Sequence, residues 1–374
     1  MRAPNSIDFW RGYALLTIFI THVPGIVFER YTLREYSLSD SAELFVFLAG
    51  VSLRFVAESL AKQPLSAAVY RLAGRALTIY YAQLIITVLA IAILAGAATV
   101  LEQPYILQWH NAAAVFENPI EAHIGLVTLR YQLGYFNILP LYVVLMACGP
   151  TIAVIHRLAP WLLFPLSLAL YLYTVATGFN LPTWPVEGNW FFSPSAWQFI
   201  FILGFLLAGP NGYARLSPRA KTVLFVLSGV QTFVGAAIAI GDITPDPALA
   251  PGPKLFFVFD KTYLSPARVV HCLALACFFG GAFAHIDRYA RPLAYFLSML
   301  GRNSLNVFCV GSLLSLCGQV ARYAFNGRWE IDWLVLGVGM GGLGFTAWVT
   351  EWRQRHGGRA KAQAQAPEPE PAER

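Results

Sequence analysis

Apolar stretches long enough to cross a bilayer recur along almost the whole of this 374-residue chain. A helix needs about 20 predominantly apolar residues to span the hydrocarbon core of a membrane. The composition agrees, because 57% of the residues are hydrophobic and only 12% are charged, whereas a soluble domain carries about a quarter charged residues. The sequence therefore predicts an all-α, polytopic integral membrane protein.

Ten spans are expected, and no cleavable signal pattern precedes the first, because Asp8 and Arg11 lead directly into its apolar run. The first span is therefore expected to be a retained anchor. Residues 1–352 are expected to form one integral membrane domain. The polar tail that follows, 353–374, is rich in Ala and Pro and is expected to be disordered. The expected spans are 11–29, 41–59, 76–100, 133–155, 161–177, 195–209, 221–240, 266–285, 303–322 and 331–350.

The distribution of Lys and Arg between the connections predicts the orientation. With a cytoplasmic N-terminus, the inside segments hold 16 of these residues and the outside segments hold 8, which is the bias that membrane insertion follows. Both termini are therefore expected in the cytoplasm. The isoelectric point near 9.1 does not indicate a nucleic-acid partner, because the basic residues are spread over inside loops without a basic and aromatic stripe.

Four ionisable residues lie at matched spacing in the first two expected spans. Arg11 and His22 are eleven residues apart, and so are Glu43 and Arg54. Eleven residues make close to three helical turns, so each pair shares one face, with its members about 16 Å apart along the axis. Charges at lipid depth are costly and by default suggest function.

Because the two helices are expected to be antiparallel, these residues form two layers. Arg11 and Arg54 would face the cytoplasm and hold the phosphates of a nucleotide-type donor. His22 would lie beside Glu43 and act as a general base, with Glu43 or Asp40 fixing its tautomer. The alternative is that these charges only neutralise one another across helices.

Other candidates stand apart from these layers, each with a structural alternative. Arg268 and His271 share a face near the outer end of the eighth span, where Arg268 would bind substrate or extend to the interface. Trp197 and Gln198 open the sixth span, and Gln198 would hydrogen-bond a sugar or another helix. Arg302 is either an orientation charge or a further phosphate contact.

The outer segment "LPTWPVEGNWFFSP" is rich in aromatic residues and contains Trp190 and Glu187. Aromatic rings at a membrane interface commonly serve as belt anchors. In the alternative interpretation the rings form a platform for a carbohydrate, because sugar C–H faces stack on them, and Glu187 accepts hydrogen bonds from hydroxyls.

Several motifs resemble those of known membrane acyltransferases. "IDFWRGYALLTIFITH" resembles the D-x-x-R-G start and the R-x10-H motif of the acyltransferase-3 group, and "DSAELFVFLAGVSLR" and "LGRNSLNVF" resemble two further segments of it. The chain is more closely similar to the OpgC family over nearly all its spans, including "ILPLYVVLMACGP" and "NWFFSPSAWQFIFILG". One departure is that Cys309 and Gly311 stand where many acyltransferase-3 members have a histidine.

This resemblance implies a bacterial inner-membrane enzyme that transfers a succinyl or similar acyl group from cytoplasmic succinyl-CoA to hydroxyls of osmoregulated periplasmic glucans. It also implies that His22 is the catalytic histidine and Arg11 the motif arginine. No metal is expected, and the lipid bilayer is the expected surrounding. A transporter or flippase of an acylated or glycan substrate remains the alternative, although the chain shows no repeated halves.

Overall fold

The computed structural model describes residues 3–61 and 63–364. In these residues regular structure is helical, apart from one isolated bridge between Pro182 and Asn189, so the all-α prediction is confirmed. The α-helices are α1 Ser6–Thr21, α2 Ser41–Leu60, α3 Leu65–Val100, α4 Ala113–Glu117, α5 Pro119–Val127, α6 Ile138–Ala147, α7 Gly149–Leu158, α8 Leu163–Thr177, α9 Pro194–Leu207, α10 Pro218–Ile240, α11 Pro266–Phe279, α12 Ala282–Tyr289, α13 Arg291–Arg302, α14 Ser304–Ala324 and α15 Trp329–Ala364. The 3-10 helices are η1 Val27–Tyr31, η2 Pro104–Asn111, η3 Pro160–Leu162, η4 Tyr213–Arg215 and η5 Lys254–Phe256.

Six helices in the described part of the chain are long and apolar enough to cross a membrane, and the bent pair α11–α12 brings the number to seven. The six are α3, Ile138–Leu158, Pro160–Thr177, α10, α14 and Trp329–His356. Ten spans were expected; α1 and α9 are shorter than a full span, and α2, although 20 residues long, carries the charged residues Glu43, Arg54 and Glu58. The first expected span, 11–29, corresponds to a helix of 16 residues that ends at Thr21.

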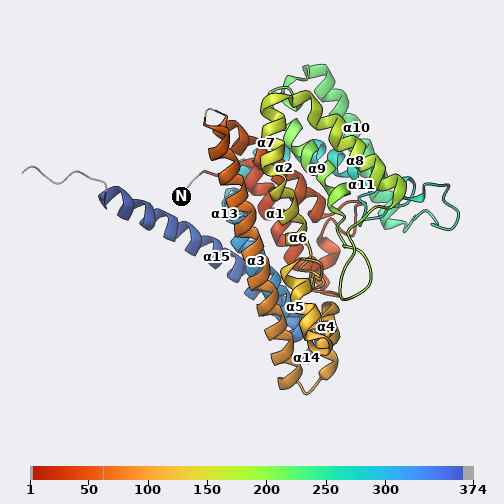
Figure 1. Ribbon diagram of the computed structural model, residues 1–374, viewed down its shortest axis with the longest axis vertical. Helices are drawn as coiled ribbons and strands as arrows, with labels where there is room; N and C mark the ends of the chain where they lie inside the picture. Colours follow the sequence, from red (N-terminus) through yellow and green to blue (C-terminus); the bar gives the residue numbers. More distant parts are fainter. Residues whose placement is uncertain (1–2, 62, 365–374) are drawn as a thin grey trace, which may run out of the picture.

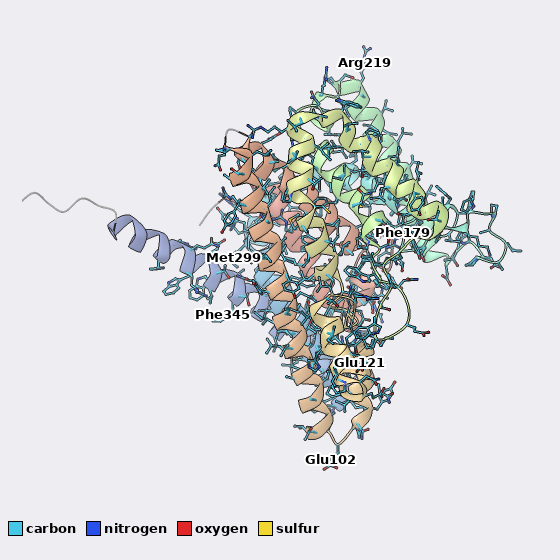
Figure 2. All side chains as sticks on the ribbon, viewed as in Figure 1. Glu102, Glu121, Phe179, Arg219, Met299 and Phe345 are labelled. Carbon is cyan, nitrogen blue, oxygen red and sulfur yellow. The ribbon has the colours of Figure 1, made fainter. Side chains whose placement is uncertain are left out.

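Large apolar side chains on the outer helices point away from the bundle, as lipid contact requires. Figure 2 shows Phe345 on α15 directed outward, and this side chain is 65% exposed. Helix α10 is similar, because only 17% of its apolar window is buried. Exposed apolar surface on this scale marks a membrane or partner interface, which supports a multi-pass membrane protein.

Helices α1 and α2 lie in the centre of the molecule (Figure 1), with α13 packed on α1 and α9 packed on α2. Both packings depend on glycine. A methyl group at Gly12 would overlap the backbone carbonyl of Leu297, and one at Gly50 would overlap that of Phe201. Small residues let membrane helices approach closely, and this contact fixes the two helices that carry most of the predicted site.

Arg302 joins the start of the described chain to helix α15 at one end of the bundle. The side chain of Arg302 contacts both the carbonyl oxygen of Ala3 and the carboxylate of Glu351. The tail expected to be disordered from residue 353 continues α15 as a helix to Ala364, and 365–374 lie outside the described residues.

Candidate active site

His22 lines a cavity of about 510 Å³ at the end of the bundle opposite Arg302. We call this the His22 cavity. Its wall combines the last turn of α1, the segment that joins η1 to α2, the start of α2, and the loops that precede α6, α9 and α11 with the first turns of α6 and α11. The lining residues are Ile18, Thr21, His22, Arg34, Ser37, Leu38, Asp40, Ser41, Ala42, Gly134, Tyr135, Asn137, Ile138, Phe191, Phe192, Lys261 and Arg268.

The position of His22 follows from where α1 stops. His22 is the C-cap residue, and its backbone N–H donates to the carbonyl oxygen of Ile18 at 3.0 Å. The helix cannot continue beyond it, because Pro24 follows and Gly25 adopts a φ of +74°. The imidazole packs against Tyr135, with 4.7 Å between ring centroids, and its Nδ1 is buried without a hydrogen-bond partner.

Asp40 and Glu43 form a capping box at the start of α2. One oxygen of Asp40 accepts from the N–H of Ala42 at 2.8 Å, and one oxygen of Glu43 accepts from the N–H of Asp40 at 2.9 Å. This arrangement satisfies the first free N–H groups of the helix.

The remaining carboxylate oxygens of the box are held by cations. The second oxygen of Asp40 accepts from Nζ of Lys261, and that of Glu43 accepts from Nε of Arg268 at 2.7 Å. Lys261 is held in place from behind, because the buried Trp197 indole donates to the Lys261 carbonyl oxygen at 3.1 Å.

The predicted pairing of His22 with a carboxylate is therefore wrong in its contacts. Asp40 lines the same cavity as His22, but its oxygens are used by the capping box and Lys261. Glu43 is fully buried against Arg268. Since the Nδ1 of His22 has no partner, neither carboxylate fixes the imidazole.

The other predicted substrate residues lie outside the lining of the His22 cavity, with Arg268 as the exception. In the loop between α8 and α9, Trp190 is buried and Glu187 is exposed. Gln198 donates to the carbonyl oxygen of Ser167 at 2.9 Å, which joins α9 to α8. His271 is fully buried behind the wall, where its Nε2 contacts the hydroxyl of Ser37 at 2.9 Å.

The aromatic segment reaches the cavity through the two phenylalanines of the quoted "NWFFSP" rather than through Trp190. Phe191 and Phe192 line it, and Tyr135 faces them from another loop. Nζ of Lys261 lies 5.9 Å from the ring centroid of Phe192. The cavity thus combines aromatic faces with cations, an arrangement suited to a sugar and an anionic group.

A second cavity, of about 450 Å³, lies toward the end of the bundle where Arg302 is found. We call this the Arg75 cavity. It shares Val56, Leu72, Arg75, Tyr142 and Ser304 with a small adjoining pocket that reaches Arg11 and Ser52. Three guanidinium groups therefore gather there. Its own lining residues are Phe45, Val56, Arg71, Leu72, Arg75, Thr78, Ile79, Leu139, Tyr142, Ser304, Leu305 and Phe308.

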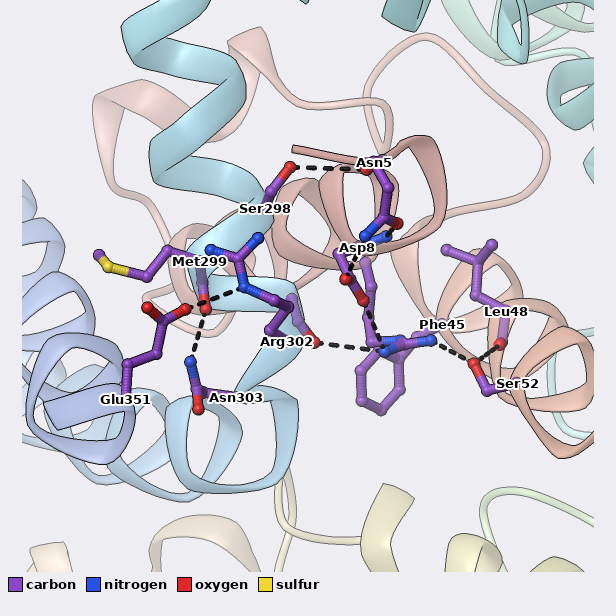
Figure 3. A network of polar contacts seen from close by, with 12 residues as sticks. Asn5, Asp8, Phe45, Leu48, Ser52, Ser298, Met299, Arg302, Asn303 and Glu351 are labelled. Carbon is purple, nitrogen blue, oxygen red and sulfur yellow. Dashed lines mark hydrogen bonds and ion pairs between the residues drawn. The ribbon is translucent and has the colours of Figure 1, made fainter. Parts of the chain in front are cut away.

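Arg11 reaches this region as predicted, but Arg54 does not join it. The Arg11 guanidinium contacts Asp8, the carbonyl oxygen of Gly301 and the hydroxyl of Ser52 (Figure 3). Arg54 follows Ser52 by two residues, so it faces the other side of α2. There it pairs with Glu58 at 2.7 Å and lies 5.3 Å from the ring centroid of Phe205.

The third predicted phosphate contact, Arg302, is already paired. Its Nε donates to Glu351 at 2.9 Å (Figure 3), and both side chains are largely buried. Its role in the structure is to join α13 to α15, and it lines neither the His22 cavity nor the Arg75 cavity.

Three aromatic side chains line the Arg75 cavity close to the start of α2, which lines the His22 cavity. Ser41 and Ala42 face the His22 cavity, and Phe45, one turn later on α2, faces the Arg75 cavity. The ring of Phe45 lies 5.2 Å from that of Tyr142 and 6.1 Å from that of Phe308, measured between centroids. We call these three residues the aromatic partition. The Tyr142 hydroxyl also donates to the carbonyl oxygen of Phe45 at 3.1 Å.

The comparisons with known proteins identify the family. The family model described as OpgC protein matches residues 2–355, which is nearly the whole chain. No curated protein matches the chain, and no solved structure does. The chain therefore belongs to the OpgC family, and this membership supports a transferase role in the modification of osmoregulated periplasmic glucans.

Proposed function

We propose that this protein is an inner-membrane O-acyltransferase that moves a succinyl group from cytoplasmic succinyl-CoA to a hydroxyl of a periplasmic glucan. The observation that carries the proposal is the pair of cavities along α2, one lined by His22 and the other by arginines and the aromatic partition. A base and a phosphate site are what a transfer from a nucleotide thioester requires.

The donor phosphates are assigned to the Arg75 cavity. Arg71 and Arg75 are four residues apart on one face of α3, and both line it. Arg11 lies in the adjoining pocket with Arg75. Guanidinium groups bind phosphate oxygens with two parallel hydrogen bonds. With the expected orientation, this cavity lies toward the cytoplasm, where acyl-CoA is found.

The acceptor and the free end of the acyl group are assigned to the His22 cavity. The aromatic rings there offer stacking faces to a sugar. Lys261 and Arg34 supply positive charge near the mouth, with side chains that are 30% and 52% exposed. Arg268 was expected to bind substrate, but it is paired with the fully buried Glu43 and is only 11% exposed. Lys261 and Arg34 are paired as well, with Asp40 and Glu29, but their greater exposure makes them the better candidates for the succinyl carboxylate.

Transfer then proceeds by direct attack. The imidazole of His22 accepts the proton of the glucan hydroxyl while the hydroxyl oxygen bonds to the thioester carbonyl carbon. The tetrahedral intermediate collapses as the C–S bond breaks, and the departing thiolate takes the proton from the imidazolium. The products are a succinyl ester and free coenzyme A, and no covalent enzyme intermediate is formed.

Purified protein, incubated with isotopically labelled succinyl-CoA and periplasmic glucan, tests the proposal. We expect labelled succinyl ester on the glucan, detected by mass spectrometry, with release of free coenzyme A. If the labelled donor is bound but no ester forms, or if acetyl-CoA serves equally well, the proposal as stated is wrong.

Transport is a second candidate, and one observation favours it. The α11–α12 pair is bent by 44° at its break, and transporters build their sites from discontinuous helices. Uptake of glucan into liposomes that carry the protein, without any ester formed, would support transport over transfer.

A further inference from the structure

The segment between α3 and α6 brings two aromatic side chains to His22. The ring of Tyr135 packs against the His22 imidazole in a tilted arrangement, with 4.7 Å between ring centroids and an interplanar angle of 42°. His110 in turn meets Tyr135 at 5.1 Å and 64°. Neither residue stands out in the sequence, because both belong to an irregular stretch more than eighty residues away from His22.

Both aromatic residues are held in a backbone conformation that costs free energy. His110 has a φ of +56° and Tyr135 a φ of +64°, and Asn111 beside His110 has a φ of +64°. Residues other than glycine seldom adopt this left-handed region, and where they do, the surrounding structure enforces it, commonly at functional sites. Here the N–H of Gly134 donates to the carbonyl oxygen of His110 at 2.8 Å, which ties the two strained positions together.

Gln319 on α14 completes the arrangement. Its side-chain nitrogen donates to the backbone carbonyl oxygen of His22, and its side-chain oxygen lies 2.6 Å from Nε2 of His110. Since that amide oxygen is an acceptor, Nε2 of His110 carries the proton. Burial lowers the pKa of His110 below its ordinary value. The ring is therefore neutral at neutral pH, with Nε2 as the donor to Gln319.

We propose that Tyr135, His110 and Gln319 form a positioning clamp that holds the His22 imidazole against the wall of the His22 cavity. The proposal rests on the proposed function and deepens it. Asp40 and Glu43 do not contact the imidazole, so the tilted ring contact with Tyr135 and a hydrogen bond to the backbone carbonyl of His22 fix it instead. The clamp residues act through His22 and are positioning residues.

His22 and its three clamp residues come from three separate parts of the chain. His22 ends α1, His110 and Tyr135 lie between α3 and α6, and Gln319 belongs to α14. Each contact alone would leave the ring free to rotate or the helix end free to shift. A displacement of about 1 Å at a reacting group costs on the order of 100-fold in rate, so the clamp bears directly on turnover.

Three substitutions at Tyr135 separate positioning from stability. Tyr135→Phe keeps the ring, Tyr135→Ala removes it and keeps the left-handed strain, and Tyr135→Gly removes both, because glycine adopts a positive φ freely. We expect Tyr135→Phe to retain kcat, and both small variants to lose about 10- to 100-fold in kcat with little change in KM. The glycine variant should unfold at a higher temperature than the alanine variant.

Equal kcat in two variants of unequal stability would show that activity follows the ring. The proposal is overturned if kcat follows the unfolding temperature across the three variants, or if the alanine and glycine variants turn over like the wild type. Thermal unfolding of the purified full-length protein gives the first quantity, and initial rates of ester formation give the second.

Gln319→Glu is nearly isosteric and removes the donor to the His22 carbonyl. We expect kcat to fall by about tenfold or more. Gln63→Glu, at an exposed position in the turn after α2, makes the same chemical change elsewhere and should leave kcat unchanged. Equal kcat in these two variants and the wild type would contradict the assigned role of Gln319.

One readout does not depend on transfer at all. Diethyl pyrocarbonate acylates accessible neutral imidazoles, and mass spectrometry of the peptide that contains His22 reports its rate of modification. We expect that rate to rise several-fold in Tyr135→Gly and to stay at the wild-type value in Tyr135→Phe. If His22 proves dispensable for ester formation, the proposed function fails, and this rate still decides whether the clamp exists. Unchanged modification in Tyr135→Gly would overturn the clamp.

Discussion

The His22 cavity and the Arg75 cavity are built in different ways. Loops and helix ends form the first, and its ionic groups are joined in pairs, as Asp40 is to Lys261. Helix faces form the second, where Arg71 and Arg75 project from the regular helix α3. The proposed function assigns the chemistry to the first cavity, which is built from several separate segments, and the anchoring of a highly charged group to the second.

The largest effect is expected from the residue that distinguishes the first cavity. His22→Ala removes the proposed base and should lower kcat by about 100- to 10,000-fold, with little change in the affinity for succinyl-CoA. Initial rates of ester formation and equilibrium binding of the donor measure the two quantities. His123→Ala, at an exposed histidine of α5, is the control and should behave as the wild type. Ester formation at the full rate in His22→Ala would contradict the assignment.

The next effect tests the second cavity. Arg75→Gln should raise the KM for succinyl-CoA by roughly 10- to 100-fold, because a hydrogen bond to a charged phosphate is lost, while the KM for glucan stays constant. Arg54→Gln is a matched control, since Arg54 pairs with Glu58 on the other side of α2. If both variants raised the KM equally, the arginines of the Arg75 cavity would have no special part in donor binding.

A smaller effect is expected at the mouth of the His22 cavity. Lys261→Met should reduce the preference for succinyl-CoA over acetyl-CoA by about tenfold, because one cation near the free carboxylate is gone. Arg268 remains within 3.9 Å of Asp40 in this variant, so the carboxylate of Asp40 keeps a partner. The exposed Lys254 provides the control substitution, Lys254→Met. A preference that does not change would exclude Lys261 from acyl recognition.

The smallest effect tests whether the two cavities are separate. Phe45→Ala opens the aromatic partition and should raise hydrolysis of succinyl-CoA in the absence of glucan by a few-fold, because water then reaches the thioester. Release of free thiol measures this directly. Phe55→Ala, at a half-exposed ring on the same helix, should leave hydrolysis at its basal rate. Hydrolysis that is equal in both variants would show that the partition does not control access of water.

Hydropathy and charge predicted much of the fold and part of the site. The helical class follows from apolar runs that only a helix can satisfy in lipid. The spacing of Arg11 and His22 on one helix correctly places them toward opposite ends of α1. Spacing within one helix depends only on local sequence, so it can be predicted from the sequence.

Contacts between helices were harder to predict, because they depend on rotation about each axis. Arg54 was paired with Arg11 by depth alone, although the face of α2 that meets Arg11 carries Ser52. Asp40 and Glu43 already show the pattern of a capping box in the sequence, and that signal would have removed them as partners of His22. Arg71 and Arg75 were assigned to an inside loop because the third span was expected to begin at residue 76. Helix α3 begins at Leu65, eleven residues earlier, and therefore includes both arginines.

The clamp on His22 had no signal in the sequence at all. His110 and Tyr135 lie in irregular structure, and their left-handed backbone depends on contacts such as that between Gly134 and His110. Pattern-based reasoning detects periodic segments, whereas positions of this kind are set by tertiary packing.

The central claim is that an acyl group passes from a donor at the Arg75 cavity to an acceptor at the His22 cavity. Proteoliposomes of uniform orientation, with labelled succinyl-CoA supplied on the side of the Arg75 cavity and glucan on the side of the His22 cavity, test it most directly. The account predicts labelled succinyl ester on the glucan across the membrane with the wild type and almost none with His22→Ala. Ester that forms only when donor and glucan share one compartment, or equally well in His22→Ala, would contradict it.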